Sequence, residues 1–308
     1  RSTGVAIRLM RSVLLWIHGT YVTGLFGLIL YICLKLSRLY LLEKVHIESI
    51  LCMEENGLDV KIVVATHKKY WMPDDKVYLP LHVGCAGKED LGYQGDDTGD
   101  NISQKNANYC ELTGLYWAWK NLESEYIGLC HYRRYFVGNR WKKTNEAILK
   151  TKDFEELLIR CPVIVPTKRR YYIETNRSHY NHAHYTKDLD MVEALICELY
   201  PEYHLAFKKV MDRTWAHMFN MLVMRRDLLD RYCRWLFHLL GEVEQRTDIS
   251  RYDPVEARIY GYLSELLLDV WLEANNITYA EVQVRFMERQ NWVKKIALFI
   301  KRKYFGHK

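Results

Sequence analysis

Apolar residues recur along the middle of the chain in short β-branched runs that alternate with longer stretches of helical spacing. The runs VKIVVAT, at residues 60–66, and CPVIVP, at residues 161–166, are typical of buried strands. The pattern predicts strands over residues 60–66, 161–166 and 217–226, a strand that runs into a loop over residues 126–136, and helices over residues 105–121, 188–199, 227–245 and 254–275. Strands and helices that alternate in this way predict an α/β fold, with a mostly parallel sheet flanked by helices.

The two ends of the chain differ from this middle. Residues 12–34 contain no Asp, Glu, Lys or Arg, and about 20 apolar residues suffice to cross a bilayer core. We expect a hydrophobic, membrane-associated helical segment there; the alternative is a buried or interfacial helix pair broken near Gly24 and Gly27. Residues 291–308 place apolar side chains on one side of a helix and lysines on the other, which suits an anionic membrane surface. A packed C-terminal helix with a solvated basic face fits that pattern equally well.

Length and composition narrow the classes of protein. A chain of 308 residues that is 49% hydrophobic and 27% charged can bury a large core and is not intrinsically disordered. Eight scattered cysteines without a CxxC pair indicate reduced thiols in a protein that faces the cytosol. The net charge of +6 suits an anionic small ligand or membrane face. Nucleic-acid binding is disfavoured, because the positive charge concentrates at the ends and no recognised binding motif occurs. We expect three parts: a membrane-associated segment (1–58), a globular domain (59–290) and a basic amphipathic tail (291–308).

Carboxylates gather in the loop GDDTGDNIS at residues 95–103. Asp96, Asp97 and Asp100, together with Asn101, offer oxygen atoms that could hold a divalent cation. The alternative is a solvated turn stabilised by bonds from these side chains to the nearby backbone. We expect ligand contact at this loop.

A second cluster, His131-Tyr132-Arg133-Arg134-Tyr135, comes directly after an apolar run. Ligands in open α/β sheets bind beyond the carboxyl ends of strands. Arg133 and Arg134 are therefore placed to clamp a diphosphate with forked hydrogen bonds. The alternative is a surface arginine pair beside buried tyrosines.

Three histidines, His179, His182 and His184, lie within SHYNHAHY. No cysteine or carboxylate completes a tetrahedral zinc set at a recognised spacing. We expect this segment to line an acceptor cleft rather than to bind a metal.

The last long helix has a polar stripe. Arg258, Tyr262, Glu265 and Asp269 are spaced four, three and four residues apart, so they share one face. If that face lines a cleft, Glu265 is placed to act as a general base toward a hydroxyl. The alternative is a surface ion pair of little energetic value.

Several of these strings together resemble one family. The strings are THK (66–68), DDTGDNISQKNANYCELTGLYWAWKN (96–121), YIGLCHYRRYF (126–136), HMFNMLVM (217–224) and RIYGYLSELLLDVW (258–271). They resemble the bacterial capsular and exopolysaccharide glycosyltransferases once filed as a domain of unknown function, over roughly residues 59–288. The resemblance implies a GT-A-like, Rossmann-type nucleotide-sugar transferase, and some members are galactofuranosyltransferases. The hydrophobic N-terminus is not part of the pattern.

The resemblance also implies roles for residues. Thr66, His67 and Lys68 would contact the nucleotide base and ribose, and the loop residues Asp96, Asp97, Asp100 and Asn101 would line the donor site. His131-Tyr132-Arg133 occupies the slot of the usual Asp-x-Asp metal motif, so no cofactor is certain; Mn²⁺ or Mg²⁺ remains an alternative, and Arg133 and Arg134 are expected to replace the metal in part. The other residues expected in the site are, for the sugar or acceptor, His217, Asn220, Arg258, Tyr262 and His182, and, as the base, Glu265.

These observations predict a hexosyltransferase. It would move a hexose, such as galactose or galactofuranose, from a UDP-sugar to a hydroxyl of a lipid-linked or polysaccharide acceptor in capsule, exopolysaccharide or O-antigen synthesis. The expected location is the cytoplasmic side of the inner membrane. The alternative is a non-catalytic carbohydrate-binding protein on the same fold, which the abundance of aromatic residues fits equally well.

Overall fold

A computed structural model describes residues 57–138 and 144–288, and from Leu58 onward these belong to one compact unit. The expected membrane segment at residues 12–34 and the basic tail at residues 291–308 lie outside the described residues. Among the described helices, none combines the length and apolarity needed to span a membrane.

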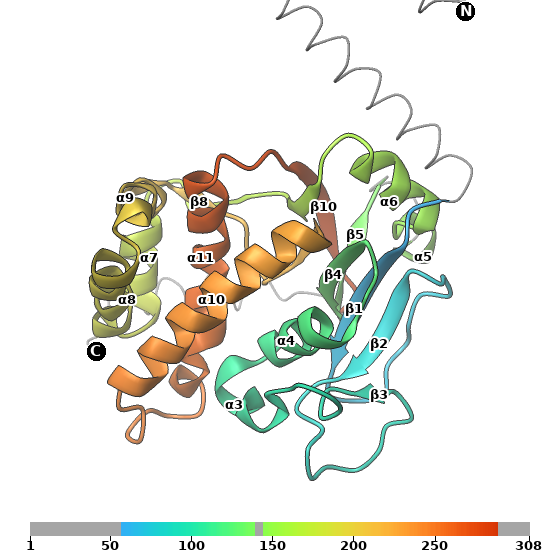
Figure 1. The fold of residues 1–308 in the computed structure, drawn as a ribbon, viewed down its shortest axis with the longest axis horizontal. Helices are drawn as coiled ribbons and strands as arrows, with labels where there is room; N and C mark the ends of the chain where they lie inside the picture. Colours follow the sequence, from blue (N-terminus) through green and yellow to red (C-terminus); the bar gives the residue numbers. More distant parts are fainter. Residues whose placement is uncertain (1–56, 139–143, 289–308) are drawn as a thin grey trace, which may run out of the picture. The chain divides into compact units, whose positions relative to one another are not determined.

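An eight-stranded sheet forms the centre of this unit (Figure 1). Its order is β3-β2-β1-β4-β5-β10-β6-β9, and β9 also pairs with β4. The strands are β1 (Val60–Thr66), β2 (Tyr78–His82), β3 (Gln94–Gly95), β4 (Tyr126–His131), β5 (Arg134–Val137), β6 (Val163–Pro166), β9 (Leu222–Arg225) and β10 (Ala280–Phe286).

The sheet is mixed, so the prediction of a mostly parallel sheet is wrong. Strands β3, β2, β1 and β4 run parallel, as do β6 and β10, but β5 and β9 run antiparallel to each of their neighbours. The run 126–136, expected to be a strand that leads into a loop, instead forms two strands, β4 and β5, joined by Tyr132 and Arg133. A two-residue connection forces antiparallel pairing, and the continuous apolar run conceals the turn.

Five strands close into a ring. Strands β4, β5, β10, β6 and β9 pair in succession, and β9 returns to β4. Gly128 permits this closure, because a Cβ atom there would lie 2.9 Å from the carbonyl oxygen of Leu222 on β9.

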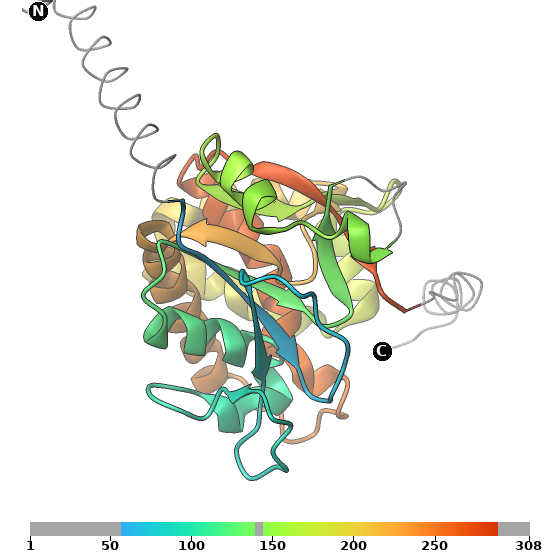
Figure 2. The ribbon, with the colours of Figure 1, turned by 90° about the vertical axis from the view of Figure 1, so that its right-hand side faces the viewer.

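Helices cover both faces of the sheet. Helix α4 (Leu112–Asn121) packs on β1 and β4, α10 (Arg226–Arg246) packs on β4 and β9, and α6 (Thr151–Leu158) contacts β1 and β6. Figure 2 shows α4 and α6 on opposite sides of the strands. The core between them includes Ile62, Val63 and Val64 of β1, all fully buried.

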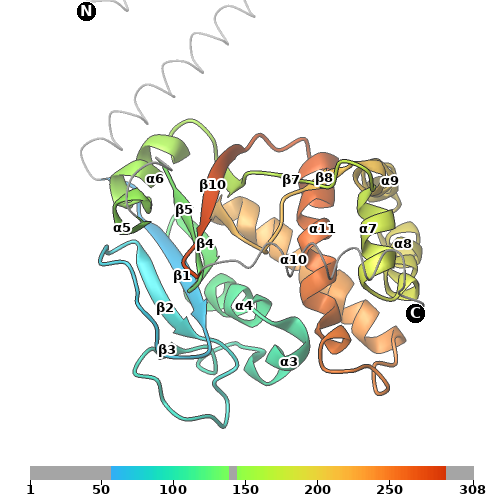
Figure 3. The same cartoon turned by 180° about the vertical axis from the view of Figure 1, so that it is seen from behind.

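A helical layer lies beside the sheet. Helix α11 (Ile259–Ala274) packs against α10 and α9 (Figure 3). The remaining elements are α3 (Asn106–Tyr109), α5 (Thr144–Ala147), α7 (Asn176–Ala183), α8 (Thr186–Leu199), α9 (His204–Asp212), the short strands β7 (Arg169–Arg170) and β8 (Trp215–Ala216), and the 3-10 turns η2 (Ser103–Lys105), η3 (Pro201–Tyr203) and η4 (Glu256–Arg258).

The expected helices at 188–199, 227–245 and 254–275 are confirmed as α8, α10 and α11. The expected helix at 105–121 is broken into α3 and α4 at Cys110, whose φ of 53° is left-handed. The six described cysteines are free thiols, and Cys85, Cys130 and Cys233 are buried, as expected of reduced thiols.

Candidate functional site

The site is built where β4 turns into β5, beside the first turns of α11. Glu265 of α11 is half-buried, and its Oε1 accepts a hydrogen bond of 3.1 Å from the backbone N–H of Phe219. Burial and the neighbouring carboxylate of Glu111 raise the pKa of Glu265 to about 7, against the opposing effects of the Arg134 charge and of the Phe219 N–H. Glu265 and Arg134, far apart in the sequence, are therefore electrostatic neighbours.

Aromatic rings hold Arg134, and no carboxylate of the described residues lies within ion-pair distance of it. Its guanidinium carbon lies 4.6 Å from the centroid of the Phe219 ring and 5.4 Å from that of Phe286. Its Nε is buried and lacks a hydrogen-bond partner among the described residues. Burial lowers the pKa of Arg134, while Glu111 and Glu265 favour its charged form, and an arginine so placed stays protonated. A cation with an unused donor is suited to an anionic ligand.

Arg133 has different neighbours. Its guanidinium lies 3.4 Å from Glu288 and 5.1 Å from the centre of the Tyr132 ring. From the sequence we expected Arg133 and Arg134 to bind a diphosphate together. In the structure it is Arg134 that lies near the carboxylates Glu111 and Glu265.

The segment 217–220 is strained. Phe219 and Asn220 have φ angles of 81° and 53°, which residues other than glycine rarely adopt. Helix α11 holds them there: Glu265 accepts from Phe219 N, and Ser264 Oγ donates to Asn220 Oδ1 over 2.7 Å. Asn220 Nδ2 in turn donates to Glu111 Oε1 over 2.9 Å. Backbone strain held in place by surrounding bonds is a feature of functional sites.

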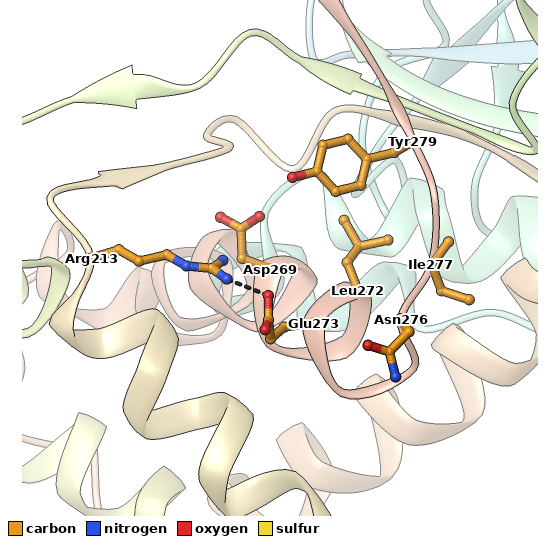
Figure 4. A pocket seen from close by; sticks show the side chains of 7 residues that line it. All are labelled: Arg213, Asp269, Leu272, Glu273, Asn276, Ile277 and Tyr279. Carbon is orange, nitrogen blue, oxygen red and sulfur yellow. Dashed lines mark hydrogen bonds and ion pairs between the residues drawn. The ribbon is translucent and has the colours of Figure 1, made fainter.

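His217 anchors the same segment from inside. It is 1% exposed, its Nδ1 lies 2.5 Å from Asp269 Oδ1, and its backbone N–H donates to Asp269 Oδ2. Asp269 lines a cavity of about 100 Å³ together with Arg213, Glu273 and Tyr279 (Figure 4). This burial makes His217 a support of the strained segment rather than a surface for sugar.

On the other flank, two tyrosines stack on histidines: Tyr262 belongs to α11, and Tyr171 follows β7. Tyr262 stacks on His184 at 4.1 Å between ring centres, and Tyr171 stacks on His179 at 4.0 Å. Burial raises the pKa of Tyr171 to about 12, and the nearby carboxylates of Glu265 and Asp269 add to this.

Buried carboxylates orient these histidines. Glu174 accepts from His179 and His182, and Glu256 from His184, at distances of 2.9 to 3.1 Å. The three histidines thus face carboxylates rather than one another.

Arg258 lies on the same side of the site, with its guanidinium carbon 5.6 Å from the centre of the Tyr262 ring. Its Nε lies 3.1 Å from Cys110 Sγ, and burial raises the pKa of that thiol to about 11. The left-handed Cys110 and the adjacent Glu111 were missed by the sequence analysis, although both lie within the string 96–121 that carries the family resemblance.

Residues 61–276, which hold most of these groups, match a family model described as a domain of unknown function, DUF4422. The chain belongs to the DUF4422 family. The family resemblance seen in the sequence is thereby confirmed.

A solved structure titled as the apo form of WbbM, a bifunctional glycosyltransferase, is 31% identical in sequence, with a TM-score of 0.70. The match covers 75% of this chain and 46% of WbbM, so the chain spans less than half the length of that protein. A search of curated proteins gave no match.

Within the DUF4422 region, the strand ends hold the expected donor residues together. Thr66 is buried and its hydroxyl donates to the backbone oxygen of Lys68 over 2.6 Å. His67 packs edge-on to Tyr132, with ring centres 5.4 Å apart, and Lys68 lies over the same ring at 5.2 Å. Burial and the charge of Arg133 lower the pKa of His67.

His131, at the end of β4, is uncharged. Burial and the charges of Arg134 and Arg133 lower its pKa to about 3. Its Nδ1 accepts a hydrogen bond of 3.3 Å from Arg133 N, so its proton lies on Nε2.

The carboxylate loop of the DUF4422 region does not reach this site as a unit. Asp96 is fully buried and accepts bonds from Gly84 N and Ser103 Oγ, so it stabilises its own loop. Asp97 is exposed, and Asn101 bonds to the backbone of its own turn.

Asp100 lies at the wrong end of α4 for a contact with Arg134. It accepts from Tyr116 and lies near Lys120, in the last turns of that helix, whereas Glu111 precedes its first turn. Ten helical residues span about 15 Å. The expectation that the whole loop lines one donor site is therefore not met for Asp96 and Asp100.

In residues 57–138 and 144–288, no three His, Cys, Asp or Glu side chains lie close enough together to hold a metal ion. A neutral His131 between two guanidinium groups favours an anion over a cation.

Proposed function

We propose that this chain is a glycosyltransferase of GT-A-like fold that transfers a hexose, galactose or galactofuranose, from a UDP-sugar to a hydroxyl of a lipid-linked or polysaccharide acceptor. Membership of the DUF4422 family and the likeness to the glycosyltransferase WbbM support the reaction class. The observation on which the proposal rests is that Glu265, whose pKa is raised by burial to about 7, lies within electrostatic reach of the Arg134 guanidinium.

Arg134 serves the donor. When the C1–O bond to UDP breaks, its electron pair leaves with the diphosphate, and the negative charge grows on that oxygen. A guanidinium already fixed between Phe219 and Phe286, with a free N–H donor, stabilises this charge without reorganising. The aromatic walls exclude water, which strengthens the interaction.

Glu265 serves the acceptor. A general base is most effective when its pKa lies near the working pH, because it is then both ionised and basic enough to take a proton. A pKa of about 7 meets this condition. The carboxylate takes the hydroxyl proton while the acceptor oxygen forms its bond to C1, which gives a direct displacement.

The stacked rings beside Glu265 suit the acceptor glycan. Tyr262 on His184 and Tyr171 on His179 offer flat apolar faces, and the buried Glu174 and Glu256 fix the histidines in place. Sugar rings pack well on such faces, and the polar edges remain to bond hydroxyls.

A nucleotide-sugar binding screen tests the proposal. UDP should raise the melting temperature of the full chain by several degrees, UDP-galactose or UDP-galactofuranose should raise it further, and GDP-mannose should have little effect. Release of UDP, measured in the presence of acceptor glycan, should follow the same order. Absence of both a shift and UDP release with every UDP-sugar would refute it.

One observation favours a second function, glycan binding without catalysis. A surface recess of about 780 Å³ is lined by Tyr116, Trp119, Tyr203, Trp235 and Phe237 among others. Trp119 and Phe237 stack with ring planes only 5° apart. Two results together would favour this function. The wild type would hydrolyse no sugar nucleotide, and the Glu265→Gln variant would bind glycan as well as the wild type does.

A further inference from the structure

The turn after β7 exposes two large apolar side chains side by side. Tyr172 is 81% exposed and Ile173 is 73% exposed. Most of the other large apolar side chains of the described domain are covered, so this turn is a distinct feature of its surface. It lies on the strand pair β7–β8, which Figure 3 shows next to α11.

The backbone holds these side chains outward by a strained turn. Ile173 N donates to Tyr171 O over 2.8 Å, which closes a three-residue γ-turn, and the central Tyr172 has a φ of 64°. The form of γ-turn with a positive central φ is rare and costly for a residue with a side chain. A glycine at this position would relieve the strain.

The turn is firmly anchored on both sides. Tyr171 N donates to Thr214 O, and Asn176 N donates to Arg213 O. The buried Asn176 side chain also donates to Val210 O and Trp215 O. Tyr172 and Ile173 therefore project from a rigid base.

Positive charge accompanies the apolar tip. Arg170 is exposed and lies two residues before Tyr172. Arg169 belongs to the inner side of the turn, because its guanidinium carbon lies 5.3 Å from the centre of the Tyr171 ring and its charge acts on Glu265. Glu174, which follows the tip, is buried against His179 and His182. The outer side of the turn is thus apolar and cationic.

We propose that the tip of this turn, Tyr172 and Ile173 with Arg170 beside them, inserts into the surface of an anionic bilayer. Tyrosine favours the headgroup level of a membrane, and an adjacent arginine gains from anionic lipid. Two protruding side chains are too few for the core of a stable protein interface, which needs about 800 Å² on each partner. They suffice for shallow membrane insertion. The inference stands on the turn itself and is independent of the transfer reaction.

Hydrogen–deuterium exchange of the full chain with lipid vesicles tests this locally, whatever other segments bind lipid. Vesicles of phosphatidylcholine with phosphatidylglycerol should slow exchange in peptides that cover residues 168–175 by about tenfold. This size is expected because insertion buries the two apolar side chains. Phosphatidylcholine alone should slow it less. The double variant Tyr172→Gly with Ile173→Ser should lose the protection, and Arg170→Gln should weaken it on anionic vesicles only.

Two variants on α9 serve as matched controls. Leu205 is 80% exposed and Lys208 is exposed, so Leu205→Ser and Lys208→Gln remove the same kinds of group elsewhere. Both should keep wild-type protection at residues 168–175. Glycine suits the φ of Tyr172, so the tip variant should melt as the wild type does. Unchanged exchange of the wild-type turn on anionic vesicles, or equal protection in the tip variant, would overturn the proposal.

Discussion

The environment of Glu265 sets its chemistry. Burial and Glu111 disfavour the carboxylate, while Arg134 and the N–H of Phe219 favour it, and the balance leaves a pKa of about 7. The base works only when ionised. Activity should therefore be high above pH 7 and fall as the pH drops through that value, in contrast to a carboxyl with an ordinary pKa near 4.

The dependence of kcat/KM on pH measures this directly. We expect a decrease of about tenfold per pH unit below pH 7. Glu111→Gln, which removes the like charge beside Glu265, should shift the decrease to lower pH. A profile that stays flat from pH 8 to pH 5 would contradict the role of Glu265.

The two arginines should differ in effect. Arg134→Met removes the cation next to Glu265 and should lower kcat about 10²- to 10³-fold. Arg133→Met removes a cation that faces Glu288 and Tyr132 and should lower it much less. The paired kinetics test the separation, and equal losses in both variants would restore the view that they form one clamp.

Arginine in place of a metal predicts tolerance to chelators. Transfer measured in EDTA should remain at the level found without it, because the Arg134 guanidinium would already supply positive charge to the leaving diphosphate. Complete loss in EDTA, with recovery on addition of Mn²⁺, would contradict this.

At the level of elements, helix α11 organises the site. Asp269, Glu265 and Ser264 hold His217, Phe219 and Asn220 in turn, so one helix face fixes a strained segment. The polar stripe on this helix was visible in the sequence. The strained segment 217–220, which this stripe contacts, was not visible. The sequence predicts a strand over 217–226 and gives no sign of the positive φ angles of Phe219 and Asn220.

Asp269→Asn should loosen this arrangement. It weakens a buried pair with His217, and we expect a loss of about 2 to 4 kcal/mol in the free energy of unfolding. Urea denaturation measures this. Asp190→Asn, at an exposed ion pair with Arg177, should leave the midpoint close to that of the wild type. Equal stability of Asp269→Asn and wild type would show that the pair does not support the segment.

The spacing of apolar residues along the chain predicted the strands and helices that depend on that spacing alone. The buried strands β1 and β6 and the amphipathic helices α8, α10 and α11 follow from apolar spacing. The β4–β5 turn was hidden by an unbroken run of apolar and aromatic residues, and the break at Cys110 by helical spacing on both sides of it.

For the whole molecule, the closed ring explains what sequence alone could not supply. Strand β10 joins β5 and β6 from the far end of the chain, and β9 closes on β4. These pairings bring Phe286 and Phe219 to Arg134. Arg134 and Glu265 could each be proposed from the sequence, but their proximity depends on long-range pairing. Asp96 and Asp100, neighbours in the sequence, have different surroundings: Asp96 is buried within its own loop, whereas Asp100 contacts Tyr116 and Lys120 of α4.

The central claim is that Glu265 deprotonates the acceptor hydroxyl, and single-turnover transfer by Glu265→Gln tests it most directly. The amide keeps the shape of the side chain but cannot take a proton. We predict that transfer falls about 10³-fold while the Kd for UDP is unchanged, and that Glu156→Gln, at an exposed position on α6, behaves as the wild type. Near-normal turnover by Glu265→Gln would contradict the account.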